Sequence, residues 1–270
     1  MPRLPPELER EIFELAFRSH RDAALWRTLC LVARRVQCWI DLIHYEMVTI
    51  NDDLHADTFL ALIEANTKPL HLFDAVKTLC LPYTVKETSA CGILAVCTRV
   101  ERLACWLNFK DSPELPVLLS RLPLRQLSLE IIHFCQIPLA PSTWLSDLTH
   151  LELVAWKNYD AAALYKLSHL PQLTHVALNF DRDGMGVEHI VAVLSSCPHL
   201  QIFVAIVQSD ELYLDFELDD YRIVVQATAD DVIKDWEASY LGLADMWSVA
   251  EATVEEQRQE AFDAIFPSSQ

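Results

Sequence analysis

The chain has 270 residues, of which 52% are apolar and 22% charged, so it can bury a substantial core. Its net charge is −18, and residues 207–270 hold 16 Asp and Glu against 3 Lys and Arg, which disfavours binding to nucleic-acid phosphates. A membrane span needs about 18 or more consecutive apolar residues, and the sequence has no such run. We therefore expect neither a nucleic-acid partner nor a membrane.

The first 45 residues predict a small module of short helices. Pro5 and Pro6 stand where a helix can begin, because the first helical turn leaves backbone N–H groups unpaired in any case. Leu8 and Ile12 then follow one helical turn apart on the same face. Two further helical stretches follow before residue 45, and three short helices make a core so small that it needs support from neighbours.

Residues 46–206 contain a repeat. The pattern apolar-x-x-apolar-x-small/apolar recurs every 24 to 27 residues, in copies that start at Val76, Val100, Leu124, Leu148, Leu173 and Leu200. This period and the Leu-x-x-Leu-x-Leu core are typical of leucine-rich repeats. Because the apolar positions of one copy are buried only by the next, the repeat predicts an α/β solenoid of parallel strands with helical returns.

Two further features bear on this fold prediction. The Asn that usually follows each repeat strand occurs only as Asn108, which indicates irregular repeats with varied return paths. The rival fold is a Rossmann-type sheet, which would need longer apolar strands and a Gly-rich turn after one of them. The chain has neither, and it contains only 4 Gly.

Residues 207–270 predict an acidic cap made of a last strand and two helices. The strand is Arg222–Val225, and the helices carry Trp236 and Trp247 among apolar residues at helical spacing. Such a cap would close the C-terminal end of the repeat stack, because a solenoid needs a polar outer face at its ends. The alternative is a mobile acidic arm that binds a partner.

The polar side chains of the repeat strands predict a recognition surface. Residues that flank the central apolar position of each strand should point away from the helical side of the sheet and form two columns. The members that we expect to contact a captured protein are Arg102, Gln126, His150, Glu152 and His175. Two neighbouring imidazoles predict binding that changes between about pH 5 and 7. The alternative is an ordinary solvated sheet face.

The sequence contains no recognisable catalytic or metal motif. No G-x-S-x-G, P-loop or H-E-x-x-H segment occurs, and Asp181–Gly186 lacks the Glu that would end a calcium loop, so it predicts a turn. The 8 Cys include no Cys-x-x-Cys pair, which favours buried, reduced thiols in the cytoplasm or nucleus over a disulfide or zinc framework. We expect a binding protein without catalytic residues, metal or cofactor.

Three segments carry a resemblance to a known family. The opening residues have the spacing of an F-box, namely Leu4, Pro5, Glu7, Leu8, Ile12 and Phe13. Leu29–Arg35, with Trp39 beyond it, resembles the later helix of that module. With the repeats and the segment Asp235–Glu237, the whole chain is similar to F-box-like proteins with leucine-rich repeats that occur in fungi.

The resemblance implies a role in ubiquitin transfer. F-box proteins dock on a Skp-family adaptor of an SCF-type cullin–RING ubiquitin ligase, and their repeats hold a protein substrate, which is unknown for this chain. Carried over by position, the adaptor-binding residues are Leu4, Pro5, Leu8, Ile12 and Val32. The alternative is a leucine-rich-repeat interaction scaffold that joins no ligase.

Overall fold

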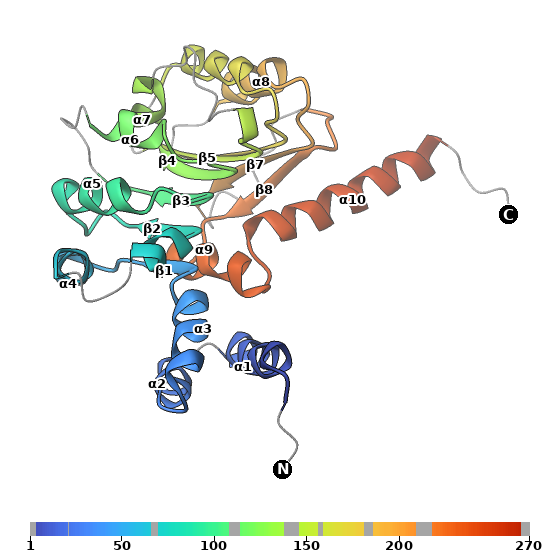
Figure 1. Cartoon of the computed structure of the whole chain (residues 1–270). Helices are drawn as coiled ribbons and strands as arrows, with labels where there is room; N and C mark the ends of the chain where they lie inside the picture. The colour runs from blue at the N-terminus through green and yellow to red at the C-terminus, as the bar shows by residue number, and fades with distance from the viewer. Residues whose placement is uncertain are drawn as a thin grey trace, which may run out of the picture.

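The chain folds around one parallel β-sheet, as the computed structural model shows (Figure 1). The structure describes residues 4–20, 22–65, 70–107, 114–137, 146–155, 159–180, 186–208 and 218–265. The sheet has eight strands in sequence order, and each strand pairs in parallel with the next. They are β1 (Met47–Thr49), β2 (Thr78–Leu81), β3 (Arg102–Cys105), β4 (Gln126–Glu130), β5 (His150–Ala155), β6 (His175–Phe180), β7 (Ile202–Val207) and β8 (Ile223–Ala227).

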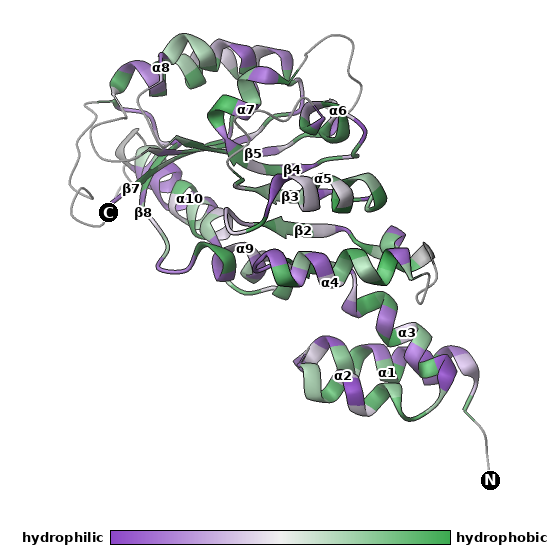
Figure 2. Ribbon diagram, turned by 90° about the vertical axis from the view of Figure 1, so that its left-hand side faces the viewer, coloured by the Kyte–Doolittle hydropathy of each residue, from purple (hydrophilic) through white to green (hydrophobic). Residues whose placement is uncertain are grey.

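The helices that return the chain between strands lie along one face of the sheet (Figures 1 and 2). They are α4 (Asp53–Glu64), α5 (Glu87–Val96), α6 (Leu115–Leu119), α7 (Ile131–Gln136), α8 (Val187–Ser196) and the 3-10 helices η1 (Leu70–Ala75) and η3 (Ala161–His169). One continuous core forms where the inward side chains of strands and returns meet, such as Leu103, Leu127 and Phe134. A parallel strand pair requires such a crossover connection, so the helical layer follows from the sheet topology.

The predicted strand spacing and register are confirmed. The central apolar residues of successive repeats pair directly across the sheet, from Leu79 with Leu103 to Val176 with Phe203. Tyr45–Ile50, which resembles a degenerate copy of the repeat, contains β1, and the predicted last strand forms β8. The chain is therefore an α/β protein with a parallel sheet and helical returns, as predicted. A helical stretch is also predicted at residues 160–169, and the chain forms the 3-10 helix η3 there.

Three helices form the N-terminal module, which lies beside the sheet rather than within its layers (Figure 1). They are α1 (Pro6–His20), α2 (Ala23–Cys30) and α3 (Arg34–His44). Asp22 starts α2, because its carboxylate accepts a hydrogen bond from the Leu25 N–H at 2.6 Å. The small core of the module contains Phe17, Val36 and Ile40, together with Leu29 and Ile43.

The N-terminal module is tied to the sheet by a polar junction. The Arg18 guanidinium on α1 donates two hydrogen bonds to Glu46, just before β1, at 2.9 and 3.0 Å. The Tyr240 hydroxyl donates to the same Glu46 carboxylate at 2.7 Å. One carboxylate thus joins the N-terminal module, the first strand and the C-terminal tail.

The C-terminal tail forms two helices that cover the opposite face of the sheet (Figure 2). They are α9 (Val232–Leu241), which ends at Gly242 with a φ of 71°, and α10 (Met246–Ile265). A left-handed backbone at a helix end favours glycine because it has no Cβ to clash. We call the side of the sheet beneath α9 and α10 the covered face.

The two helices were expected at the C-terminal end of the stack, and that position is wrong for α9. Trp236 of α9 is buried against Cys80, Ala104 and Val154 of β2, β3 and β5. Trp247 of α10 is buried against the last strands, in a cluster with Ala177, Val204 and Val224. The sheet accepts both indoles because many side chains of the covered face are small. Within the described residues, no helix is long and apolar enough to cross a lipid bilayer.

Candidate functional site

The N-terminal module exposes a group of large apolar side chains. They come from α1, the residues before it and the turn between α2 and α3, and we call them the N-terminal patch: Leu4, Leu8, Ile12, Leu15, Leu31 and Val32. Each is 48–88% exposed. Four of the five predicted adaptor-binding residues belong to this patch, and the fifth, Pro5, is also exposed. A set of large exposed apolar side chains on so small a module is typical of an interaction surface.

An ion pair between α1 and α3 places Leu8 and Val32 of this patch at the same end of the module. The Arg35 guanidinium, at the start of α3, donates two hydrogen bonds to Glu9 on α1 at 2.6 and 3.0 Å. This pair holds the first turn of α1 beside the first turn of α3. Leu8 precedes Glu9 directly and Val32 lies three residues before Arg35, so both belong to the same end of the module. Inward side chains such as Phe17 face the core, which leaves Leu8 and Ile12 on the outer side.

The second candidate site is a layer of polar side chains between the sheet and the tail helices, which we call the interlayer site. Arg102, Gln126, His150 and His175 pair in register across β3 to β6, as predicted. The Arg102 guanidinium donates to the Gln126 amide oxygen at 2.8 Å and also to the Ser239 hydroxyl of α9.

The predicted exposure of this row is wrong, because α9 and α10 cover it. Gln126 is 9% exposed and His175 only 6%. The five residues predicted to contact a substrate thus lie beneath the tail in this structure, and their binding role stays a prediction.

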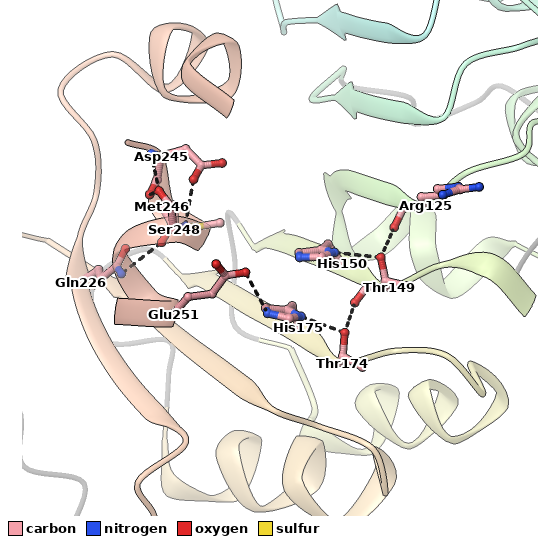
Figure 3. A network of polar contacts seen from close by, with 10 residues as sticks. All are labelled: Arg125, Thr149, His150, Thr174, His175, Gln226, Asp245, Met246, Ser248 and Glu251. Atoms are coloured by element: carbon pink, nitrogen blue, oxygen red, sulfur yellow. Dashed lines mark hydrogen bonds and ion pairs between the residues drawn. The ribbon is translucent and has the colours of Figure 1, made fainter. Parts of the chain in front are cut away.

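The two imidazoles of the interlayer site form a stacked pair on neighbouring strands (Figure 3). Their ring centroids lie 4.1 Å apart with an angle of 15° between the planes. The Trp247 ring packs nearly perpendicular to both imidazoles, at centroid distances of 5.2 and 5.7 Å. Glu251 of α10 approaches the outer nitrogen of His175, with Oε1 3.6 Å from Nε2.

Burial keeps both imidazoles neutral near pH 7. It lowers the pKa of His150 to about 4, helped by the neighbouring His175 and Arg102, and it lowers the pKa of His175 to about 4. The two rings therefore gain protons only in acid well below the predicted window of pH 5 to 7, and that part of the prediction is wrong.

Glu152 occupies the other column of the covered face and lines a cavity of about 390 Å³ beneath α9 and α10. The Trp106 indole donates to the Ser128 hydroxyl at 2.7 Å, and that hydroxyl donates to Glu152 at 2.6 Å. Burial raises the pKa of Glu152 to about 7, and the nearby Asp235 adds to the rise, while the hydrogen bonds from Ser128 and Asn179 oppose it. The carboxyl is thus about half protonated at neutral pH.

The sequence did not single out three of the tail residues that complete the interlayer site, namely Ser239, Asp245 and Glu251. The fourth, Trp247, was expected only as an apolar residue of the cap. Charge offered one signal, because the acidic tail complements a row that contains Arg102. No spacing rule could link these residues, since they are far from the strands in the sequence.

Metal-ligating side chains converge at one point of the described structure. His150, His175 and Glu251 each offer one ligand atom, and these atoms lie within 4.8 Å of one another. No cysteine belongs to this group of ligands. Five of the eight thiols are buried in apolar surroundings, as predicted, and burial raises the pKa of Cys80 and Cys105. The turn predicted at Asp181–Gly186 lies outside the described residues except for Gly186.

Comparison with known proteins adds no assignment. No protein-family model matches the sequence, and no curated protein matches it significantly. A functional interpretation of the chain therefore depends on the two sites described above and on the resemblance of its opening residues to an F-box.

Proposed function

We propose that this chain is a substrate-recognition subunit of an SCF-type ubiquitin ligase, without catalytic residues of its own. It docks a Skp-family adaptor through Leu4, Pro5, Leu8, Ile12 and Val32, and it holds a target protein elsewhere on its surface. The observation that carries the proposal is the N-terminal patch, which leaves six large apolar side chains in solvent on a module of only three helices. Burying such side chains against a partner stabilises a complex by about 1 kcal/mol for each half-exposed aliphatic chain.

The polar junction supports the same function. A recognition subunit has to hold its target at a fixed position relative to the ligase, because ubiquitin transfer requires proximity of the reacting groups. Glu46 accepts hydrogen bonds from Arg18 of the N-terminal module and from Tyr240 of α9. An adaptor docked on α1 would therefore be linked through the junction to the sheet and to the tail that covers it.

The covered face changes where the target is expected to bind. Arg102, His150 and His175 contact a target only if α9 and α10 leave the sheet, and these helices bury Trp236 and Trp247 there. We therefore assign the target to the accessible outer surface of the helical returns. That surface keeps several exposed apolar side chains, namely Tyr83, Val117, Tyr165, Val187 and Val191.

The test is binding of the full chain to a purified Skp-family adaptor, measured by titration calorimetry. We expect the wild type to bind and the double variant Leu8→Asp, Ile12→Asp to bind at least 100-fold more weakly, because two apolar contacts are lost and two charges are buried. Leu8→Ala with Ile12→Ala should weaken binding about 30-fold. Val191→Asp is the matched control, since Val191 is an aliphatic residue of similar exposure on α8, far from the patch in the fold.

Two results would count against the proposal. A wild-type chain that fails to bind an adaptor, in an assay where a known F-box protein binds, would leave the chain as an interaction scaffold outside the ligase. Equal loss of binding and of cooperative melting in the Leu8 and Ile12 variants would instead assign those residues to the core. Circular dichroism of each variant separates these two outcomes.

A further inference from the structure

The stacked imidazoles of the interlayer site have a defined proton arrangement. The Thr149 hydroxyl lies 3.0 Å from the carbonyl oxygen of Arg125, and the Thr174 hydroxyl lies 3.2 Å from the carbonyl oxygen of Thr149. A hydroxyl has one hydrogen, and a carbonyl oxygen can only accept it. When each hydroxyl donates to its carbonyl, it has only acceptor capacity left for the imidazole Nδ1, which lies 2.8 Å away in both cases.

This arrangement assigns the hydrogen of each ring. With the Thr hydroxyls donating to the carbonyls, Nδ1 of His150 and Nδ1 of His175 carry the hydrogen that their Thr partners accept. A neutral imidazole has a single N–H, so both Nε2 atoms present lone pairs. Metal-binding imidazoles show the same division, with one nitrogen donating a hydrogen bond that orients the ring and the other facing the ion.

A third ligand faces one of these lone pairs. Oε1 of Glu251 lies 3.6 Å from Nε2 of His175 and lacks a hydrogen to offer when it is ionised (Figure 3). Two acceptors that face each other repel unless a positive species lies between them. His150 completes the group, since one ligand atom from each of the three residues lies within 4.8 Å of the other two.

We infer that His150, His175 and Glu251 bind a divalent transition-metal ion of the zinc class through two Nε2 atoms and one carboxylate. Bonds of about 2.1 Å in a tetrahedron place ligand atoms about 3.4 Å apart. The pair His175 and Glu251 already has nearly that separation at 3.6 Å, and the ligand atom of His150 lies within 4.8 Å of both. Two nitrogens and one oxygen favour zinc, cobalt, nickel or copper over calcium and magnesium, which prefer oxygen ligands.

The surroundings of the three ligands suit an ion that enters from solvent. Glu251 is 57% exposed on its side chain, whereas His175 is buried on the sheet side. Trp247 packs nearly perpendicular to both rings and limits their movement. The positive charge of Arg102, two strands away from His150, disfavours a cation at the site, and the negative charge of Asp245 offsets this effect. A bound ion would join α10 to β5 and β6, so it would fasten the tail over the covered face.

The test uses the full chain with its exposed thiols removed, since Cys38 and Cys135 could bind zinc on their own. The background Cys38→Ser, Cys135→Ser is stripped with a chelator and titrated with zinc by calorimetry. We expect one site per chain, weakened on the order of 100-fold by Glu251→Gln or by His175→Ala. Glu256→Gln and His199→Ala are the matched controls, because they remove exposed side chains of the same types outside the site.

Two further measurements keep the inference falsifiable if His175→Ala fails to fold. Glu251 is exposed, so Glu251→Gln should melt like the background protein in chelator and lose the rise in melting temperature that zinc gives the background. The visible spectrum of the cobalt form should lack the thiolate charge-transfer band. Equal zinc binding by the background and by Glu251→Gln would overturn the inference, as would the absence of zinc binding by the background protein.

Discussion

Replacing Trp236 by Ala tests whether the tail stabilises the whole protein. The indole is 6% exposed and packs against Cys80, Ala104, Trp106 and Val154. The Arg102 guanidinium carbon lies 5.9 Å from its ring centroid, within the range of a cation–π contact. Truncation of a buried Trp to Ala costs about 3–5 kcal/mol, and we expect the free energy of unfolding to fall by that amount.

The companion change Trp236→Phe should have a much smaller effect. The indole N–H has no hydrogen-bond partner among the described residues, and a buried unpaired donor costs about 1–3 kcal/mol. Phe keeps most of the apolar contact and removes this donor, so the gain offsets the lost ring area. We expect Trp236→Phe to remain within about 1 kcal/mol of the wild type.

Denaturant unfolding followed by far-UV circular dichroism measures both changes. Val249→Ala is the control, because Val249 is exposed on α10 and its loss should matter by less than about 0.5 kcal/mol. A double-mutant cycle checks the placement of α9, since Thr49 donates to Glu237 at 2.6 Å and Thr49→Val with Glu237→Gln should couple by about 1 kcal/mol. A loss below about 1 kcal/mol for Trp236→Ala, or zero coupling, would refute the packing of α9 on the sheet.

Three further predictions concern charge and the tail. Burial raises the pKa of Glu152 from its ordinary 4.5 to about 7, so with chelator present the contribution of this carboxyl to stability should be greatest below pH 4.5 and fall by roughly 3 kcal/mol as the pH rises through 7; the difference in stability between the wild type and Glu152→Gln, followed in a series of melts, should show this fall. Arg18→Gln should speed amide hydrogen exchange in α1 while β4 and β5 stay protected, and unchanged exchange would contradict the junction at Glu46. Truncation after Ala227 removes α9 and α10 and should cause aggregation, visible by light scattering; a soluble monomer with an unchanged melt would contradict their structural role.

The repeat in the sequence was sufficient to predict the sheet. Leu79, Leu103 and Leu127 recur at one spacing, and they pair directly across β2, β3 and β4 because each repeat makes one strand and one return. The helix α8 follows from the same local rule, since its apolar side chains recur with the helical period between a Gly and a strand. Local periodicity determines such elements, so sequence alone can place them.

The position of the tail could not be predicted in the same way. Alternation along a strand indicates that Ala104 and His175 point away from the helical returns, but it does not say whether water or another layer covers them. One compositional signal was present, because Cys80, Ala104 and Ala177 are too small and apolar for a solvated column. Its partner Trp236 lies 156 positions after Cys80, and no spacing rule reaches that far.

The return of α9 to the first strands has a consequence for biosynthesis. Cys80 and Ala104 leave the ribosome long before Trp236, and at about 5–20 residues per second the interval between Cys80 and Trp236 is roughly 10 to 30 s. Throughout that time the apolar side of β2 and β3 lacks its final layer. The nascent chain therefore exposes an aggregation-prone apolar surface while translation continues. Premature termination before residue 232 would release a product that depends on chaperones to avoid aggregation.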